Sequence, residues 1–325
     1  MTSWKIFEGT GKPHAGLDRL PDPPNWRVFQ DESSRQTRKG STFQARPEEI
    51  DLVNAALYLR RPLLVEGKPG TGKTSLAYAV ANELELGEVL YWPITTRTTL
   101  KDGLYTYDAI GRLQDSQREG HDDLKDIGKY LRLGPLGTAL LPVEDSKRPR
   151  VLLVDELDKS DIDLPNDLLH VFEEGHFRIP ELLRIQEVLE TVEVGTAYSQ
   201  QEGRVNIRAG QVQCNAFPFV VLTSNGERDF PPAFLRRCLR LQMRDPNEEE
   251  LTRIVAAHLG EEVLAEAKPL IESFLRQRDT EGKELATDQL LSAIYVILQK
   301  DVPTGEAREK LLKQLLKPLS GVGAR

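Results

Sequence analysis

The sequence predicts a three-layer α/β domain with a parallel central sheet, followed by a small all-α domain. Over residues 41–245, short apolar runs of the kind that form buried parallel strands alternate with amphipathic helical stretches. After Asp245-Pro246 the strand patterns end, and four helical stretches remain, at 247–259, 261–277, 285–299 and 306–317. We therefore expect an α/β domain over 41–245 and an α-helical domain over 246–325.

The composition excludes several classes of protein. The chain has 325 residues, of which 39% are hydrophobic and 29% are charged, and its net charge of −8 argues against a surface that coats duplex DNA. Two cysteines, Cys214 and Cys238, are too few for a disulfide framework or a multi-cysteine zinc site, and the histidines lack metal-binding spacing. The start of the chain lacks a signal-peptide pattern, and no apolar run is long enough for a membrane helix. We therefore expect a cytoplasmic protein.

Apolar runs bounded by turn residues predict the strands of the α/β domain, which we expect at 62–65, 89–94, 151–154 and 217–223. Pro47 is expected to begin a helix, because proline suits the first helical position and the following Glu48 and Glu49 favour the positive end of the helix dipole. Two more helices are expected near 76–84 and over 164–174, the second ending at Gly175.

Three other segments follow different patterns. Residues 1–40 are rich in proline and glycine, which predicts an extended arm, and its aromatic and apolar side chains predict that the arm packs against the rest of the protein. Residues 97–136 are irregular and are expected to form a long loop. Residues 176–216 carry two alternating patterns around a polar turn at 198–203, which predicts a hairpin-like insertion.

The most specific motif lies between the first expected strand and the helix near 76–84, and it is Gly67-Lys68-Pro69-Gly70-Thr71-Gly72-Lys73-Thr74. It matches GxxxxGK[ST], in which glycines let backbone N–H groups surround phosphate oxygens at the start of a helix. In such a loop Lys73 reaches the β- and γ-phosphates, and the Thr74 hydroxyl binds Mg²⁺. We expect nucleotide contacts from Gly67 through Ser75. A glycine-rich turn without a ligand is the alternative, and the flanking strand and helix argue against it.

Polar residues also end two other expected strands, at the same edge of the sheet. The run Val-Leu-Leu-Val at 151–154 is followed by Asp155 and Glu156, and the strand at 217–223 is followed by Asn225 after Ser224. Asp155 is expected to hold Mg²⁺ and Glu156 to polarise an attacking water. The Asn225 amide is expected to position that water near the γ-phosphate.

Two arginines follow a proline-bounded segment at 231–235. Arginine stabilises the charge of a transferring phosphoryl group, and it acts in the same chain or from a neighbouring subunit. Arg236 and Arg237 are therefore candidates for this role, and a surface ion pair is the alternative.

The order of these motifs, with a helical region after them, resembles the AAA+ ATPases. The segment 167–177, Asp-Leu-Leu-His-Val-Phe-Glu-Glu-Gly-His-Phe, is similar to the MoxR-like and dynein-related branch, and the resemblance covers roughly residues 43–300. It implies a P-loop NTPase domain with a helical lid, and assigns 67–74 to Walker A, Asp155-Glu156 to Walker B and Asn225 to sensor 1. Arg237, with Arg236 second, corresponds to the arginine finger that acts on a neighbour.

The family resemblance also implies cofactors and partners. These are ATP and Mg²⁺, a ring that is usually a homo-hexamer, and mechanical work on a protein client, often a von Willebrand factor A domain protein. The resemblance also implies specificity for adenine, and residues 46–50 are candidate contacts to the base. One departure is that Gln289 stands where the family has the arginine of sensor 2, and Arg308 is a later alternative cation. The other departure is the segment 176–216, which is longer than a simple hairpin.

Two alternatives to a remodelling ATPase stay open. A nucleotide-dependent switch or scaffold with little turnover would fit Gln289. An NTPase motor of a nucleic-acid-directed defence system would fit basic residues of the insertion, for which Arg204 and Arg208 are candidates, although the net charge counts against it. No (N/T)KxD guanine-binding motif is present, which argues against a GTPase.

Overall fold

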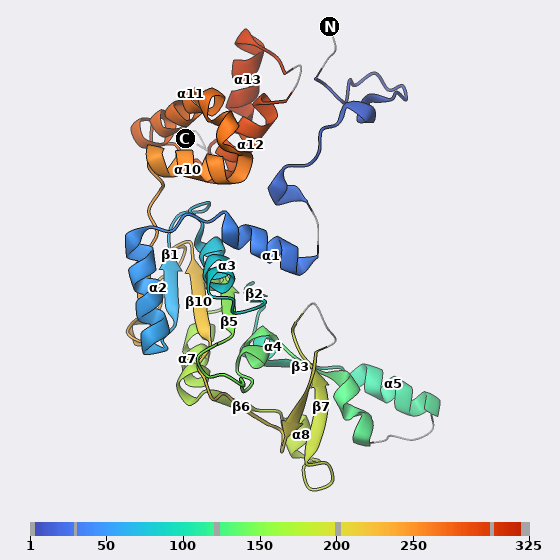
Figure 1. Cartoon of the computed structure of the whole chain (residues 1–325). Coiled ribbons are helices and arrows are strands. Elements are labelled where there is room, and N and C mark those ends of the chain that lie inside the picture. The colour runs from blue at the N-terminus through green and yellow to red at the C-terminus, as the bar shows by residue number, and fades with distance from the viewer. Residues whose placement is uncertain (1–3, 29–30, 120–123, 199–202, 300–301, 320–325) are drawn as a thin grey trace.

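The computed structural model describes residues 4–28, 31–119, 124–198, 203–299 and 302–319. The molecule is elongated, with a helical lid at one end, the main sheet in the middle and a second sheet with helix α5 (Ala109–Glu119) at the other end (Figure 1). Among the described residues, no helix has both the length and the apolar character that a membrane crossing requires.

The central sheet contains five parallel strands in the order β11-β1-β10-β5-β2. Their bounds are β1 (Leu63–Glu66), β2 (Leu90–Pro93), β5 (Val151–Asp155), β10 (Phe219–Ser224) and β11 (Leu239–Gln242). Side chains alternate between two cores: Val151 and Leu153 face one, while Leu152 and Val154 face the other. All four are fully buried, which confirms the prediction of an interior parallel strand.

Helices cover both faces of this sheet and complete the three layers. On one face lie α2 (Pro47–Leu59) and α3 (Lys73–Glu83), and on the other lie α6 (Pro135–Ala139), α7 (Leu164–Glu174) and α9 (Pro232–Leu235). Helix α2 begins at Pro47 and α7 ends at Gly175, whose φ of 62° is left-handed, so both predicted helix limits are confirmed. The predicted three-layer α/β fold is confirmed.

The extended arm predicted for residues 1–40 ends earlier than expected, because α1 (Glu32–Ser41) is helical. Asp31 caps α1 by accepting a hydrogen bond from the Ser34 backbone N–H at 3.1 Å. The helix packs closely against α3, since a Cβ atom on Gly40 would lie 2.5 Å from the carbonyl oxygen of Tyr78. The polar composition of this segment concealed a helix that is stabilised by tertiary contact.

A buried glutamine fixes α1 to the start of strand β2. The Gln36 side chain accepts from the Val89 N–H at 2.7 Å and donates to the Val89 carbonyl at 3.2 Å. These two bonds supply both partners that a neighbouring strand would otherwise provide to Val89. Gln36 is 8% exposed, so water does not replace it there.

Before α1, the arm runs to the lid. It contains two short 3-10 helices, η1 (Gly16–Arg19) and η2 (Asn25–Arg27), and Trp26 packs edge-on against His258 and Tyr295 with ring centroids 6.0 Å away in each case. The Asn25 side chain donates to the His258 carbonyl at 3.2 Å. The predicted packing is therefore confirmed at Trp26, whereas Phe7 is 84% exposed, and Phe29 lies outside the described residues.

The long loop predicted at 97–136 is wrong, because this segment and 176–216 form a second sheet together. Its six strands have the order β3-β4-β7-β8-β9-β6. Their bounds are β3 (Tyr105–Tyr107), β4 (Leu131–Leu133), β6 (His176–Arg178), β7 (Thr191–Gly195), β8 (Arg204–Arg208) and β9 (Gln211–Gln213). Three-residue strands give no detectable alternation in sequence, and β4 pairs with β7 some sixty positions later.

Several short helices accompany this second sheet, and the predicted hairpin is part of it. They are α4 (Leu100–Leu104), α8 (Pro180–Leu183) and η3 (Leu124–Tyr130). The turn η4 (Leu157–Lys159) instead follows β5 and contacts β10 of the central sheet. Strands β7 and β8 pair antiparallel, which confirms the hairpin predicted at 176–216, while residues 199–202 of its turn lie outside the described residues.

The C-terminal region is helical, as predicted. It contains α10 (Glu248–Leu259), η5 (Glu261–Val263), α11 (Leu264–Leu275), η6 (Arg276–Thr280, a π-helix), α12 (Thr287–Ile297) and α13 (Gly305–Leu315). These helices enclose their own apolar core, whose most buried members include Leu251, Phe274 and Leu290. Trp26 of the arm packs on this core from outside.

Gln36→Ala is expected to lower the free energy of unfolding by about 2–3 kcal/mol, because it removes two hydrogen bonds and leaves the buried N–H and carbonyl of Val89 unpaired. Denaturant unfolding measures the loss, and the Val89 amide should exchange faster with solvent. Thr37→Ala, an exposed change in the same helix, is the control. Equal stabilities of the two variants would contradict the role given to Gln36.

Candidate functional site

The glycine-rich loop connects β1 to α3 and needs its glycines for two separate reasons. Gly70 and Gly72 have left-handed φ values of 79° and 95°, which side chains rarely adopt. Gly67 lies so close to the last strand that a Cβ atom would be 2.6 Å from the carbonyl oxygen of Met243. The loop is therefore held open at the start of α3, where backbone N–H groups have no helical partner.

Lys73 is buried inside this loop, with 8% of its surface exposed. Its ammonium group donates to the carbonyl oxygens of Gly67 at 2.7 Å and Lys68 at 2.8 Å. Burial lowers the pKa of Lys73, and the nearby carboxylates of Asp158, Asp155 and Glu156 partly oppose that shift. An anion in the loop would replace the two carbonyls as the partner of this ammonium.

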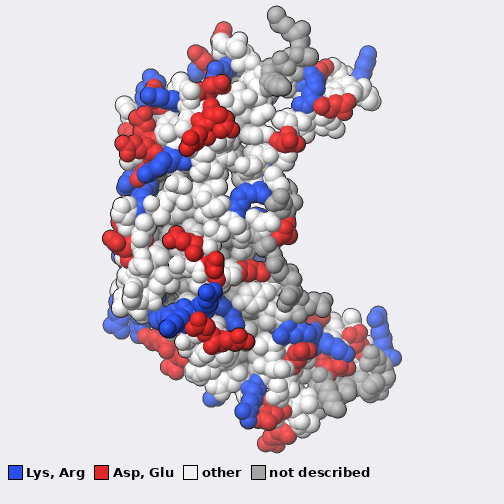
Figure 2. Space-filling view, in the orientation of Figure 1, with Lys and Arg blue, Asp and Glu red and all other residues white. Residues whose placement is uncertain are grey.

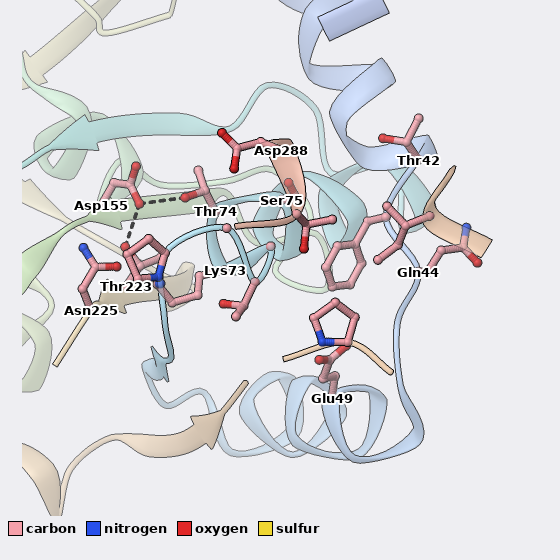
Figure 3. A pocket seen from close by; sticks show the side chains of 18 of the residues that line it. Thr42, Gln44, Glu49, Lys73, Thr74, Ser75, Asp155, Thr223, Asn225 and Asp288 are labelled. Carbon is pink, nitrogen blue, oxygen red and sulfur yellow. Dashed lines mark hydrogen bonds between the residues drawn. The ribbon is translucent and has the colours of Figure 1, made fainter. Parts of the chain in front are cut away.

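The carboxylate of Asp155 joins three elements at the carboxyl edge of the sheet, and Figure 3 shows its bonds to Thr74 and Thr223. Its Oδ1 accepts from the hydroxyls of Thr74 at 3.0 Å and Thr223 at 2.6 Å, and its Oδ2 accepts from the Tyr91 hydroxyl at 3.2 Å. Burial and the charge of Asp155 raise the pKa of Tyr91 to about 12, so the phenol remains a donor. Thr74 and Asp155, the predicted metal-binding pair, therefore lie in contact.

Glu156 has an unusual backbone conformation for its residue type. Its φ of 61° is left-handed, and its N–H donates to the Thr223 hydroxyl at 2.8 Å. For a residue with a side chain this conformation costs about 1–2 kcal/mol, and such strain concentrates at functional sites. The carboxylate lines the cavity described below and forms an ion pair with Lys159, with Nζ and Oε2 2.7 Å apart.

Asp158 is a site residue that the sequence analysis missed. It is 3% exposed, and its Oδ2 accepts from the backbone N–H groups of Asn225 at 2.9 Å and Glu227 at 3.1 Å. The carboxylate thus fixes the loop that presents the Asn225 side chain beside Asp155 and Thr223 (Figure 3). Its position three residues after Asp155 offered no indication, because its partners lie far away in the sequence.

A cavity of about 590 Å³ opens over these residues, within the range of about 300–1,000 Å³ that is typical of small-molecule sites. The loop contributes Pro69 to Ser75, and the sheet edge contributes Asp155, Glu156, Thr223 and Asn225. The far wall comes from the segment between α1 and α2 and from the lid, through Thr42, Phe43, Gln44, Ile254, His258, Thr287, Asp288 and Leu291. Gly67 and Lys68, the first two residues of the predicted nucleotide contacts, are not among the lining residues, and Lys68 forms an ion pair with Asp245 at 2.9 Å.

The candidate base contacts at 46–50 divide into two groups. Arg46 and Glu49 line the cavity, whereas Ile50 is 49% exposed on the outside of α2. The Arg46 guanidinium is buried between two carboxylates, with Glu250 at 2.9 Å and Glu49 at 3.3 Å. This cluster fixes the start of α2 to α10 of the lid, and the positive charge of Arg46 is already neutralised by these carboxylates.

The lid presents a carboxylate to the cavity instead of a cation. Gln289 closes the first turn of α12, where its Oε1 accepts from the Ala286 N–H at 3.0 Å and its amide donates to the Lys317 carbonyl at 2.8 Å. Gln289 and Arg308 are absent from the cavity lining, whereas Asp288 belongs to it and lies near Thr74 in Figure 3. The structure therefore turns Gln289, which stands at the sensor 2 position of the family, away from the cavity, and the preceding residue Asp288 lines the cavity instead.

Arg236 and Arg237 lie outside the cavity of their own chain. The Arg237 side chain forms an ion pair with Glu173 of α7 and donates to the Ala233 carbonyl at 3.2 Å. Arg61 fixes this segment by donating to the backbone carbonyls of Arg236 and of Arg237. Arg237 is thus an ion-paired residue near the surface of one chain, and its action on a neighbouring site stays a prediction.

The basic candidates of the insertion are paired as well. Arg204 binds Glu193 at 2.9 Å and Arg208 binds Glu190 at 2.7 Å. On the face shown in Figure 2, Lys and Arg side chains alternate with Asp and Glu side chains along the whole molecule. That face has no extended basic patch of the kind that binds a nucleic-acid backbone.

The strand order, the glycine loop and the helical lid define an AAA+ fold. The sequence matches the family model of the AAA domain (dynein-related subfamily) over residues 62–238, more than half of the chain. The protein belongs to this family. The match to the family model ends at residue 238, before the lid, so the lid features described above are observations on this structure alone.

Solved structures with similarity to the chain include domain III of the Thermotoga maritima replication initiation protein DnaA. It is 22% identical, with a TM-score of 0.41, over 86% of this chain and 98% of its own. NtrX from Brucella abortus in complex with ADP is 14% identical, with a TM-score of 0.42, over 87% of this chain and 58% of its own. The ATP complex of NtrX is 13% identical, with a TM-score of 0.43, over 84% and 56%. A comparison with curated proteins found no match.

Asp158→Ala is expected to lower the free energy of unfolding by about 2–4 kcal/mol, because two backbone N–H groups lose a charged acceptor. Thermal or denaturant unfolding gives the magnitude, and hydrogen exchange should accelerate at Asn225 and Glu227. The matched control is Asp163→Ala, since Asp163 is exposed and its side chain does not cap α7. Unchanged exchange at Asn225 would contradict the anchoring role of Asp158.

Proposed function

We propose that this protein binds ATP with Mg²⁺ and hydrolyses it in a ring, where each site is completed by an arginine of the next subunit. The balance of charge in the cavity carries this proposal. Among the described residues that line it, Arg46 is paired with Glu49 and Glu250, and Lys159 is paired with Glu156. Lys73 is left to meet the phosphates.

A triphosphate carries more negative charge than one ammonium group balances. The same cavity also presents the carboxylates of Asp155 and Asp288. Bound phosphate therefore requires a divalent cation and at least one further positive group. Thr74 and Asp155 have the oxygen ligands that Mg²⁺ prefers, and a bound Mg²⁺ would neutralise phosphate charge and polarise the γ-phosphate. Arg237, with Arg236 beside it, is the candidate for the further group.

The residues around the cavity have separate roles in the proposed reaction. The loop N–H groups and Lys73 hold the phosphates, and the lid with Phe43 and His258 encloses the opposite end of the cavity. The Glu156 carboxylate accepts a proton from the attacking water. Asn225, fixed through its backbone by Asp158, orients that water.

The finer parts of the proposal extend from the family resemblance. We propose a MoxR-like, homo-hexameric, cytoplasmic assembly that remodels a protein client, with a von Willebrand factor A domain protein as the first partner to examine. The acidic overall charge supports a protein client over a nucleic acid. The paired states of Arg204 and Arg208 point in the same direction.

A nucleotide-dependent switch with little turnover is the second candidate. One observation favours it: the lid supplies Asp288 and a capped Gln289 in place of a phosphate-binding arginine. In that case nucleotide binding would drive assembly, and phosphate release would stay negligible with the partner present.

Lys73→Ala is expected to weaken ATP binding at least tenfold, because it removes the one loop cation aimed at the phosphates. Glu156→Gln is expected to bind ATP and to lose phosphate release by at least a hundredfold. Equilibrium binding of a fluorescent ATP analogue and a phosphate-release assay separate the two effects. Hydrolysis by Glu156→Gln at the wild-type rate would show that another group activates the water.

Arg237→Ala is expected to bind ATP normally and to lose turnover, because its guanidinium acts on the neighbouring site. Mixing Arg237→Ala with Glu156→Gln should restore part of the turnover, since some interfaces then combine an intact Glu156 with an intact Arg237. Arg253→Ala, an exposed change on α10, is the control and should retain turnover. If the mixture stays as inactive as its components while still assembling, action in trans is wrong.

A further inference from the structure

Lys159 and Glu156 form an ion pair that the proposed reaction has to break. Both side chains line the cavity, and Lys159 Nζ lies 2.7 Å from Glu156 Oε2. An ammonium at that position occupies an oxygen of the carboxylate that would accept the proton of the attacking water. The hydrogen bond from Lys159 to Glu156 is also the main cause that raises the pKa of Lys159, so the ammonium stays charged.

The Lys159 side chain has the freedom to leave this partner. It is 39% exposed, it belongs to the short η4 turn, and exposed ion pairs of this kind contribute at most about 1 kcal/mol. The other acids that act on it are Glu227 and Asp158. Asp158 is 3% exposed, its Oδ2 accepts from two backbone N–H groups, and its buried Oδ1 has no hydrogen-bond partner among the described residues.

A γ-phosphate would compete with Glu156 for this ammonium. Lys159 lines the same cavity as Asn225 and Asp155, the residues at the carboxyl edge of the sheet. Among the described lining residues it is the cation, besides Lys73, that is not enclosed by two carboxylates. The lid does not supply a positive charge at this position, because Gln289 is uncharged and its side chain is hydrogen-bonded to Ala286 and Lys317 at the start of α12.

We propose that Lys159 is the γ-phosphate sensor of this chain, and that its transfer from Glu156 to the γ-phosphate releases the carboxylate for catalysis. The inference rests on the proposed function and deepens it. ADP lacks the group that draws Lys159 away, so Glu156 stays paired after product formation. The device thereby distinguishes ATP from ADP with a residue of the large domain. Because the Glu156 carboxylate loses its partner when Lys159 moves, the net charge of the cavity is unchanged, and the neighbouring arginine is still required.

The test is a double-mutant cycle on the full chain, with Lys159→Met, Glu156→Gln and the double variant. Affinities are measured with Mg²⁺ for a non-hydrolysable ATP analogue and for ADP. Lys159→Met is expected to weaken the affinity for the analogue about tenfold and to change the affinity for ADP less than twofold. Glu156→Gln alone is expected to tighten the analogue several-fold, because it frees the ammonium, and this gain should vanish in the double variant.

Two further variants serve as controls. Lys159→Arg keeps the charge and is expected to retain most of the preference for the analogue. Lys129→Met removes a lysine from another ion pair of the same spacing, to Asp126 at 2.6 Å, and should leave both affinities unchanged.

Three results would overturn the inference in different ways. If Lys159→Met weakened the affinities for the analogue and for ADP equally, Lys159 would have a general structural role and would not sense the γ-phosphate. Unchanged affinity for both would show that the lysine stays on Glu156 with nucleotide bound. Wild-type protein that binds neither nucleotide would refute the nucleotide site itself, and the inference with it.

Discussion

The site depends on one carboxylate placed where strands end together. Asp155 lies at the carboxyl end of β5, between β2 and β10, and it accepts hydrogen bonds from Tyr91 of β2, from Thr223 of β10 and from Thr74 of the helix that follows the glycine loop. In a parallel sheet all strands deliver their last residues to the same edge, so this contact follows from the topology. The fully buried strands beneath it keep the edge rigid, and the loop and the Asn225 segment take their positions from that edge.

The second constraint is how the lid is fixed over this edge. The Arg46 guanidinium joins α2 to Glu250 of the lid, and the arm reaches the other side of the lid through Trp26. The lid residue His258 packs against Trp26 of the arm and also lines the cavity. A ligand in the cavity would therefore lie against the lid residue that packs on the arm. The carboxylate of Asp288 would repel phosphate unless a cation lies between them. The positive charge that balances the phosphates would therefore come from the large domain and from a neighbouring chain.

Local patterns were sufficient to predict β1, β2, β5 and β10 of the central sheet, α2, α7, the lid helices and the residues of the loop, because buried strands, capping residues and glycine motifs act within a few positions. They missed the edge strand β11. The same patterns failed where tertiary contact decides the structure. Helix α1 is polar and is stabilised by packing against α3, and in the second sheet the three-residue strand β4 pairs with β7 of a distant segment. Asp158 could not be found from the sequence, because the backbone N–H groups that it binds, those of Asn225 and Glu227, lie 67 and 69 positions away.

The central claim is that one chain holds an incomplete site and that a neighbour completes it. The most direct test follows phosphate release and mass by light scattering in the same samples, across a range of protein concentrations with ATP and Mg²⁺. The account predicts that release per chain is near zero while the protein is monomeric and rises steeply as a defined ring forms. A monomer that hydrolyses ATP at a rate per chain independent of concentration would contradict it.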